Sequence, residues 1–341
     1  MLRLAATGLL VGLGATAAAA QDLTGAGATF PNPLYTKWFS DYAAKTGVKI
    51  NYQSIGSGGG IRQLTEGTVD FGASDAPMSD AEIAKLKGPV MHIPTVLGAV
   101  VITYNLPDVK TQLKLTGDVI ADIFLGKITK WNDARIVALN KGVSLPSTDI
   151  LVVHRSDGSG TTYIFSDYLA AVSQTWATAP GKGKELQWPV GLGGKGNEGV
   201  AGQVKQLPGA IGYVELAYAK QNKLAYASLK NADGEFVEPT LESVTAAAAA
   251  AAAKLPANTD YRISIVNAAG KGAYPISSFT YLLVYVNQPD ADKGKKLVDF
   301  IRWALVEGEK SAGALDYAPL PASMVTMLHK RLAEIKMVAS R

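Results

Sequence analysis

Three glycine-rich loops each lead into a segment of helical periodicity in this chain of 341 residues. The loops cover residues 56–60, 154–162 and 191–197, and predicted strands precede the first two, at 48–55 and 150–153. A chain that alternates between strand and helix in this way predicts an α/β fold, because the helices cover the sheet that the strands form. Open sheets of this class bind ligands at the carboxyl ends of their strands. The glycine-rich loops therefore hold the first candidates for a binding site.

The loop at 154–162, His-Arg-Ser-Asp-Gly-Ser-Gly-Thr-Thr, has the composition of an anion-binding site. A strand that breaks into such a loop before a helix directs unpaired backbone N–H groups and the positive end of the helix dipole at one spot. Ser159 and Thr161 add hydroxyl donors, and Arg155 adds a guanidinium that suits a tetrahedral oxyanion. Asp157 would repel an anion unless Arg155 is its partner. The same residues also fit a polar turn that caps a helix, and the loop alone leaves both interpretations open.

The sequence motifs of common nucleotide-binding and hydrolytic enzymes are not present. The phosphate-binding loop of nucleotide hydrolases has the pattern Gly-x-x-x-x-Gly-Lys-[Ser/Thr]. Gly194 and Lys195 match the second glycine and the lysine, but Pro189 stands where the first glycine is needed. The loop at 56–60 lacks the Gly-x-Gly-x-x-Gly spacing of a dinucleotide site. Neither Ser57 nor Ser159 lies in the Gly-x-Ser-x-Gly pattern of a nucleophile elbow.

The composition argues against a metal site and against nucleic-acid binding. No cysteine is present and the three histidines are scattered, so neither a zinc site nor a disulfide framework is expected, and we predict no cofactor. The 33 basic and 29 acidic residues give a mild positive excess that carries no nucleic-acid signal. The 14 tyrosines and five tryptophans show no interleaving with basic residues, and we expect them mostly in the core.

The first twenty residues are typical of a secretory signal peptide. Arg3 precedes an apolar segment at 4–11, and small residues at 18–20 provide a cleavage site, so we expect the mature chain to begin at Gln21. The apolar segment is too short for a spanning helix. Without a cysteine to carry a lipid, the exported protein is predicted to be free in solution.

Several other elements follow from local patterns. Ser79 and Glu82 have the spacing of a capping box, and Asn132 is a candidate N-cap. The apolar, β-branched segment at 98–105 predicts a central strand or a crossover between lobes. Eight alanines at 246–253 predict a helix on the surface with little to pack against.

Seven segments taken together resemble the PstS-type phosphate-binding proteins of phosphate-specific ABC transporters. They are Leu-Thr-Gly-Ala-Gly-Ala-Thr-Phe-Pro (23–31), Ile-Gly-Ser-Gly-Gly-Gly (55–60), Val-Asp-Phe-Gly-Ala-Ser-Asp-Ala-Pro (69–77), Arg-Ser-Asp-Gly-Ser-Gly-Thr (155–161), Gly-Leu-Gly-Gly-Lys-Gly-Asn (191–197), Leu-Pro-Gly-Ala-Ile-Gly-Tyr-Val-Glu (207–215) and Leu-Asp-Tyr-Ala-Pro-Leu-Pro (315–321). Their order and spacing match that family over essentially the whole mature chain. The alanine segment is the main departure, and Gly58 stands where the family often has a second serine.

The resemblance implies a periplasmic-binding-protein fold of two α/β lobes joined by crossover strands, with phosphate in the cleft between them. Residues 21–103 and 275–341 would form lobe I, and residues 104–274 would form lobe II. The phosphate-binding residues implied in lobe I are Thr29, Phe30, Ser57 and Asp75. Those implied in lobe II are Arg155, Asp157, Ser159, Gly160 and Thr161.

Asp75 has a chemical role of its own in such a site. Hydrogen phosphate carries a proton that a carboxylate can accept in a hydrogen bond, whereas sulfate at neutral pH carries none. A fully ionised anion would be repelled by the carboxylate and would leave its hydrogen bond unmade. Such a site can favour the matching ligand over the other by a factor of roughly 10⁴–10⁵ in affinity. Asp75 therefore favours phosphate over sulfate or molybdate.

The first hypothesis is a monomeric periplasmic receptor, not an enzyme, that delivers phosphate to the inner-membrane subunits of an ABC permease. A secreted phosphatase is the alternative from another class, but it needs a nucleophile with a base or a metal cluster. A receptor for another oxyanion is the third, and Asp75 speaks against it.

Overall fold

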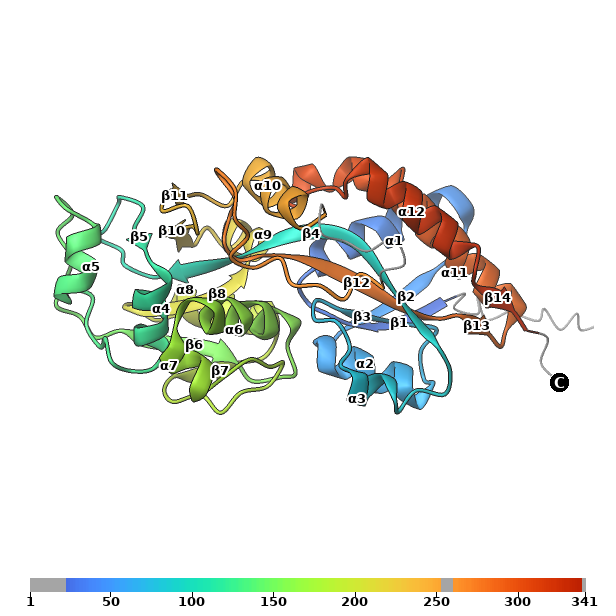
Figure 1. Cartoon of the computed structure of the whole chain (residues 1–341), viewed down its shortest axis with the longest axis horizontal. Coiled ribbons are helices and arrows are strands. Elements are labelled where there is room, and N and C mark those ends of the chain that lie inside the picture. Colours follow the sequence, from blue (N-terminus) through green and yellow to red (C-terminus); the bar gives the residue numbers. More distant parts are fainter. Residues whose placement is uncertain (1–22, 253–259, 339–341) are drawn as a thin grey trace, which may run out of the picture.

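The computed structural model describes residues 23–252 and 260–338, so the predicted signal peptide at 1–20 lies outside the described residues (Figure 1). Within these residues, nine strands form one sheet in the order β2-β1-β3-β12-β4-β8-β6-β7, with β9 beside β4. The strands are β1 (Leu23–Gly27), β2 (Ile50–Ser54), β3 (Phe71–Ser74), β4 (Val90–Tyr104), β6 (Leu151–Arg155), β7 (Leu192–Gly194), β8 (Ala210–Glu215), β9 (Ala225–Tyr226) and β12 (Ser277–Tyr285). Short strands elsewhere are β5 (Lys114–Leu115), β10 (Ser228–Lys230), β11 (Phe236–Val237), β13 (Asn287–Gln288) and β14 (Lys336–Met337).

Helices cover the sheet in two groups, which makes two lobes. In the first lobe, β1 is parallel to β2 and β3, and Figure 1 shows α2 on one side of these strands and α11 and α12 on the other. In the second lobe, β6 is parallel to β7 and β8. The first-lobe helices are α1 (Asn32–Thr46), α2 (Ser57–Glu66), α3 (Asp80–Ile83), α11 (Ala291–Ala304) and α12 (Ala322–Leu332). The second-lobe helices are α4 (Gly117–Phe124), α5 (Ala134–Leu139), α6 (Gly160–Val172), α7 (Gln174–Thr178), α8 (Gly196–Gln206) and α9 (Leu216–Gln221). This architecture confirms the predicted α/β class.

Strand β4 links the two lobes and is longer than the predicted segment at 98–105. It pairs antiparallel with β12 as far as Ala99 and with β8 from Val100 onward. The sequence pattern misses its first half because Pro94 interrupts it, and proline usually argues against a central strand. The ladder with β12 shifts register beside Pro94, and such an irregularity accommodates a residue that has no N–H to donate.

The helix starts are partly as predicted. Ser79 caps α3, and the reciprocal hydrogen bonds of the capping box with Glu82 are both formed, which confirms that prediction. Asn132 is wrong as an N-cap. Helix α5 begins one residue later, because the carboxylate of Asp133 accepts a hydrogen bond from the backbone N–H of Arg135.

The alanine-rich helix α10 (Leu241–Ala252) is not a purely surface element. Ala247 and Ala248 are fully buried, and they share one helix face with buried Val244. The small side chains let this face pack closely against the rest of the molecule, so the prediction of a helix with little to pack against is wrong.

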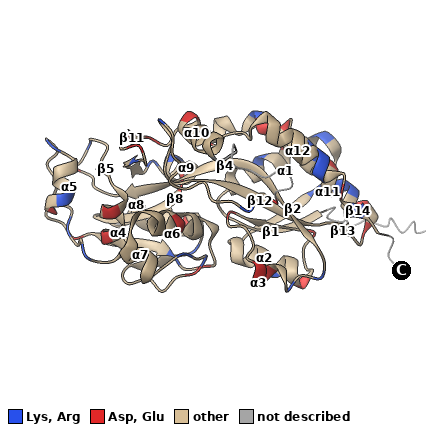
Figure 2. Ribbon diagram, viewed as in Figure 1, with Lys and Arg blue, Asp and Glu red and all other residues tan. Residues whose placement is uncertain are grey.

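Buried aromatic residues form much of the core. Trp38, Trp131 and Trp176 are fully buried, in line with the prediction that the tryptophans lie mostly in the core. Figure 2 shows basic and acidic residues interspersed along both lobes. Among the described residues, no helix has both the length and the apolar character of a membrane span.

Candidate anion-binding site

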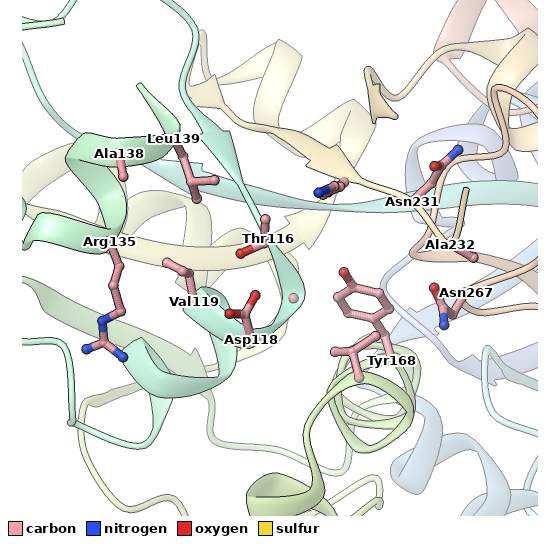
Figure 3. Close-up of a pocket in the computed structure, with 13 residues that line it drawn as sticks. Thr116, Asp118, Val119, Arg135, Ala138, Leu139, Tyr168, Asn231, Ala232 and Asn267 are labelled. Atoms are coloured by element: carbon pink, nitrogen blue, oxygen red, sulfur yellow. The ribbon is translucent and has the colours of Figure 1, made fainter. Parts of the chain in front are cut away.

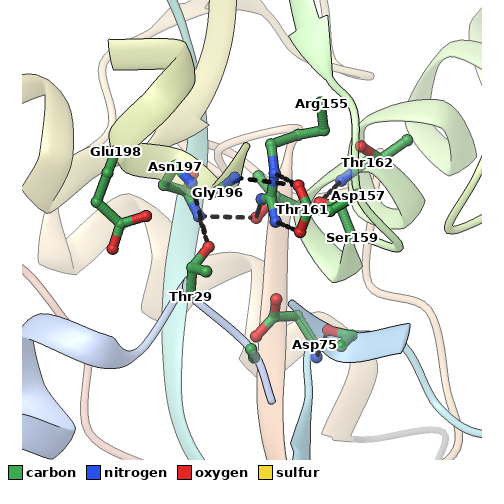
Figure 4. Close-up of polar contacts among 12 residues, drawn as sticks. Thr29, Asp75, Arg155, Asp157, Ser159, Thr161, Thr162, Gly196, Asn197 and Glu198 are labelled. Atoms are coloured by element: carbon green, nitrogen blue, oxygen red, sulfur yellow. Dashed lines mark hydrogen bonds and ion pairs between the residues drawn. The ribbon is translucent and has the colours of Figure 1, made fainter. Parts of the chain in front are cut away.

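The loop between β6 and α6 holds a buried arginine in a fixed position. Arg155 ends β6 and is 3% exposed. Its Nε donates to Oδ1 of Asp157 at 2.8 Å and its Nη2 donates to Oδ2 at 2.6 Å, so the carboxylate holds the guanidinium through two parallel hydrogen bonds (Figure 4). The remaining nitrogen, Nη1, donates to Oγ1 of Thr161 at 3.3 Å.

Asp157 remains ionised because its partners outweigh its burial. Burial alone raises the pKa of this carboxyl, but the hydrogen bonds and charge of Arg155 lower it below the usual value. The backbone N–H of Gly196 adds a further hydrogen bond to Oδ1 at 3.0 Å. Asp157 therefore moderates the charge of Arg155 and ties its loop to the third glycine-rich loop.

Helix α6 begins where the second lobe comes close to the first. Ser159 is the N-cap, and its hydroxyl accepts a hydrogen bond from the N–H of Thr162 at 3.0 Å. A side chain at Gly160 would begin 2.5 Å from Oδ2 of Asp75 and would also overlap Ser57. Glycine is therefore required where the start of α6 approaches the first lobe.

Asp75 is the buried carboxylate that faces this helix start. It follows β3, is 1% exposed, and accepts a hydrogen bond at Oδ1 from the hydroxyl of Thr280 at 2.8 Å. Its backbone N–H donates to the hydroxyl of Ser57 at 3.2 Å. Burial raises the pKa of Asp75 to about 7, although Thr280 and Arg155 oppose the shift. The first lobe thus contributes one carboxyl group that is poised between its neutral and charged forms.

The two lobes contact each other around these groups. The N–H of Gly58 at the start of α2 donates to the carbonyl of Gly158 at 2.8 Å. Lys184 of the second lobe forms an ion pair with Glu82 of the first at 2.7 Å, and both side chains are largely shielded from solvent. Burial raises the pKa of Glu82, but the hydrogen bond from Lys184 and those at Ser79 bring it below the usual value. The structure is therefore a closed arrangement of the lobes.

Residues 29 and 30 lie where β1 leads into α1. The hydroxyl oxygen of Thr29 accepts hydrogen bonds from Asn197 in the second lobe. Phe30 is fully buried, its ring lies edge-on to Tyr317 with centroids 6.4 Å apart, and its carbonyl accepts a hydrogen bond from the Tyr317 hydroxyl. The Phe30 side chain therefore belongs to the core.

A match to known proteins fits this geometry. Residues 14–305 match the model of the PBP superfamily domain. The chain is 50% identical over 307 residues to the phosphate-binding protein PstS of Xylella fastidiosa, covering 90% of this chain and 83% of that one. It is 46% identical to the PstS protein of Haemophilus influenzae, covering 91% and 92% of the two chains. The chain belongs to the PstS family of phosphate-binding proteins.

Solved structures share the fold of this PstS family member. A high-affinity periplasmic phosphate-binding protein, PfluDING, bound with phosphate, gives a TM-score of 0.72 at 21% identity over 91% of this chain and 93% of that one. The phosphate-binding protein of Stenotrophomonas maltophilia gives 0.69 at 21% identity over the same shares. The likeness at this identity establishes the two-lobed fold.

Two residues of the site are missed by sequence reasoning. Thr280 lies on β12, 205 residues from its partner Asp75, and no local pattern marks it. Asn197 is fully buried between the lobes, although its glycine-rich loop is visible in the sequence. The sequence signal that could have found Asn197 is a lone amide residue at the end of a glycine-rich loop, where α8 (Gly196–Gln206) begins.

Residues 23–252 and 260–338 contain no group of three or more His, Cys, Asp or Glu side chains placed to hold a metal ion. Figure 3 shows a separate pocket in the second lobe, between the start of α4, helix α5 and Tyr168 of α6. None of the nine predicted site residues lines it.

Proposed function

We propose that this chain binds inorganic phosphate between its two lobes in the periplasm and, as a monomer, delivers it to the inner-membrane subunits of an ABC permease. The observation that carries the proposal is a buried set of donors that faces the buried carboxyl of Asp75. The proposed ligand contacts are Thr29, Phe30, Ser57, Asp75, Arg155, Asp157, Ser159, Gly160 and Thr161. The membership of the PstS family supports the same ligand.

The proposed binding mode follows from the charges and donors of the site. Arg155 supplies the positive charge, and the N–H groups at the start of α6 supply aligned donors for the anion oxygens. Asp157 holds Arg155 in place and lowers its net attraction, so the ligand can be released to a partner. The proposed role involves no bond making or breaking, so no catalytic residue is assigned.

Titration calorimetry of the mature protein tests the function. We expect one phosphate per chain and little or no heat from sulfate under the same conditions. A phosphatase assay with and without divalent metal distinguishes a binding protein from the alternative, a secreted phosphatase. Absence of phosphate binding, or metal-dependent hydrolysis of a phosphate ester, would contradict the proposal.

The ion pair between Lys184 and Glu82 gives a prediction about closure. It joins the lobes only when they are closed, so Lys184→Met is expected to weaken phosphate binding modestly, by roughly two- to fivefold, as for an ion pair that keeps some contact with solvent. The effect should shrink at high salt because the pair is screened.

A matched control lies two residues earlier. Lys182 pairs with Asp167 at 2.7 Å within the second lobe, so Lys182→Met removes a similar ion pair without touching the interface between the lobes. Its phosphate affinity should equal that of the unaltered protein. Equal losses in both variants would mean that the Lys184 pair contributes nothing specific to closure.

A further inference from the structure

We propose that Asn197 is a positioning residue that holds the hydroxyls of Thr29 and Thr161 as hydrogen-bond donors toward the bound anion. The inference rests on the proposed phosphate site. Asn197 lies in the first turn of α8, is fully buried, and contacts residues of both lobes (Figure 4). It is not among the nine site residues that the sequence predicts.

The side-chain amide of Asn197 uses both of its hydrogens on these two hydroxyls. Its Nδ2 donates to Oγ1 of Thr29 at 2.7 Å and to Oγ1 of Thr161 at 3.1 Å. Its Oδ1 accepts a hydrogen bond from the backbone N–H of Glu215 at 2.9 Å. This last contact fixes which end of the amide faces the hydroxyls. In a flipped amide, the NH₂ group of Asn197 would face the backbone N–H of Glu215, and two donors would meet without an acceptor.

The hydrogen bonds leave each hydroxyl with only its proton to offer. A hydroxyl has one donor hydrogen and two acceptor lone pairs. Thr29 Oγ1 accepts from both the backbone N–H and the Nδ2 of Asn197, at 3.2 and 2.7 Å. Thr161 Oγ1 accepts from Asn197 and from Nη1 of Arg155, at 3.1 and 3.3 Å. Both oxygens therefore have their acceptor capacity filled by the protein.

This arrangement suits an anion specifically. The unprotonated oxygens of phosphate only accept hydrogen bonds, so a hydroxyl that is free to rotate would present a lone pair part of the time and repel them. Asn197 is neutral and contributes no attraction through charge. It acts by removing the unfavourable orientation of two hydroxyls and by joining Thr29 of the first lobe to Thr161 of the second.

A double-mutant cycle tests the proposal. Thr29→Val is expected to weaken phosphate binding roughly tenfold in the unaltered protein, as for a lost hydrogen bond to a charged group. In an Asn197→Ala background the same substitution should cost less than about threefold, because the hydroxyl there is no longer held as a donor. A full tenfold loss in both backgrounds would overturn the proposal and leave Asn197 with a purely structural role.

The controls separate positioning from folding. Asn140 is a buried asparagine of the second lobe that bonds the backbone of Lys114 and Ile136, so Asn140→Ala should lower stability without changing the cost of Thr29→Val. If Asn197→Ala does not fold, Asn197→Ser enters the same cycle. Phosphate binding by the unaltered protein shows that the proposed function holds, so an additive cycle then refutes only the role of Asn197.

Discussion

Replacing Arg155 by alanine is expected to weaken phosphate binding by between about 100- and several thousand-fold. The guanidinium is buried, and removing one member of a buried charge pair costs roughly 3–5 kcal/mol. The loss also leaves the Asp157 carboxylate without its partner beside the anion. Calorimetric titration with phosphate measures the effect directly.

The control for this prediction is an arginine on the surface of the same lobe. Arg135 pairs with Asp122 and Asp133 and is about half exposed, so Arg135→Ala should leave phosphate affinity unchanged. A loss of less than tenfold in Arg155→Ala would show that Arg155 does not face the ligand.

Replacing Asp75 by asparagine is expected to narrow the ratio of phosphate to sulfate affinity, chiefly by improving sulfate. The other predicted site residues donate hydrogen bonds or hold a donor in place, whereas Asp75 is proposed to accept a hydrogen bond from the O–H group of hydrogen phosphate. An amide of the same size can donate, so the repulsion that excludes sulfate disappears. Phosphate should bind about as well or moderately worse, because the lost hydrogen bond is partly offset by the lost repulsion.

The pH dependence of sulfate binding provides a second readout. The pKa of Asp75 is raised to about 7, so lowering the pH through that value protonates and neutralises the carboxyl. Sulfate remains doubly charged in this range, and its affinity for the unaltered protein should therefore rise as the pH falls from 8 to 6. Asp75→Asn should bind sulfate with little pH dependence over the same interval.

Asp70→Asn is the matched control for both experiments. Asp70 is a first-lobe aspartate that binds Thr24 and Lys293. It should leave the phosphate-to-sulfate ratio unchanged. An unchanged ratio in Asp75→Asn as well would make Asp75 a structural carboxylate and place the discrimination elsewhere.

The parts of the site that the sequence predicts are those built from contiguous residues. Arg155 and Ser159 belong to one strand-loop-helix unit, and both the end of β6 and the start of α6 follow from local apolar periodicity and capping. That these residues lie close to Asp75 could be predicted only from the family resemblance, because no sequence periodicity relates residues on different lobes.

The parts that the sequence does not predict depend on tertiary contacts. Thr280 and Asn197 act on partners 205 and 168 residues away, and neither residue type is rare in ordinary loops or strands. The first half of β4 is missed because Pro94 is locally unfavourable in a strand, and only the ladder irregularity opposite β12 makes it acceptable. The burial of Ala247 and Ala248 likewise depends on what α10 packs against.

Strand β4 also determines how the lobes can separate. It is buried from Met91 to Tyr104 and hydrogen-bonded to β12 and then β8, so the lobes cannot slide past each other without breaking its ladders. We therefore expect opening to be a bend and twist concentrated near Ala99 and Val100, where β4 changes partners. Each closing rotation brings the same residues back into register. With such a hinge, most of the entropy of aligning the lobes would be lost during folding and not at each capture of a ligand.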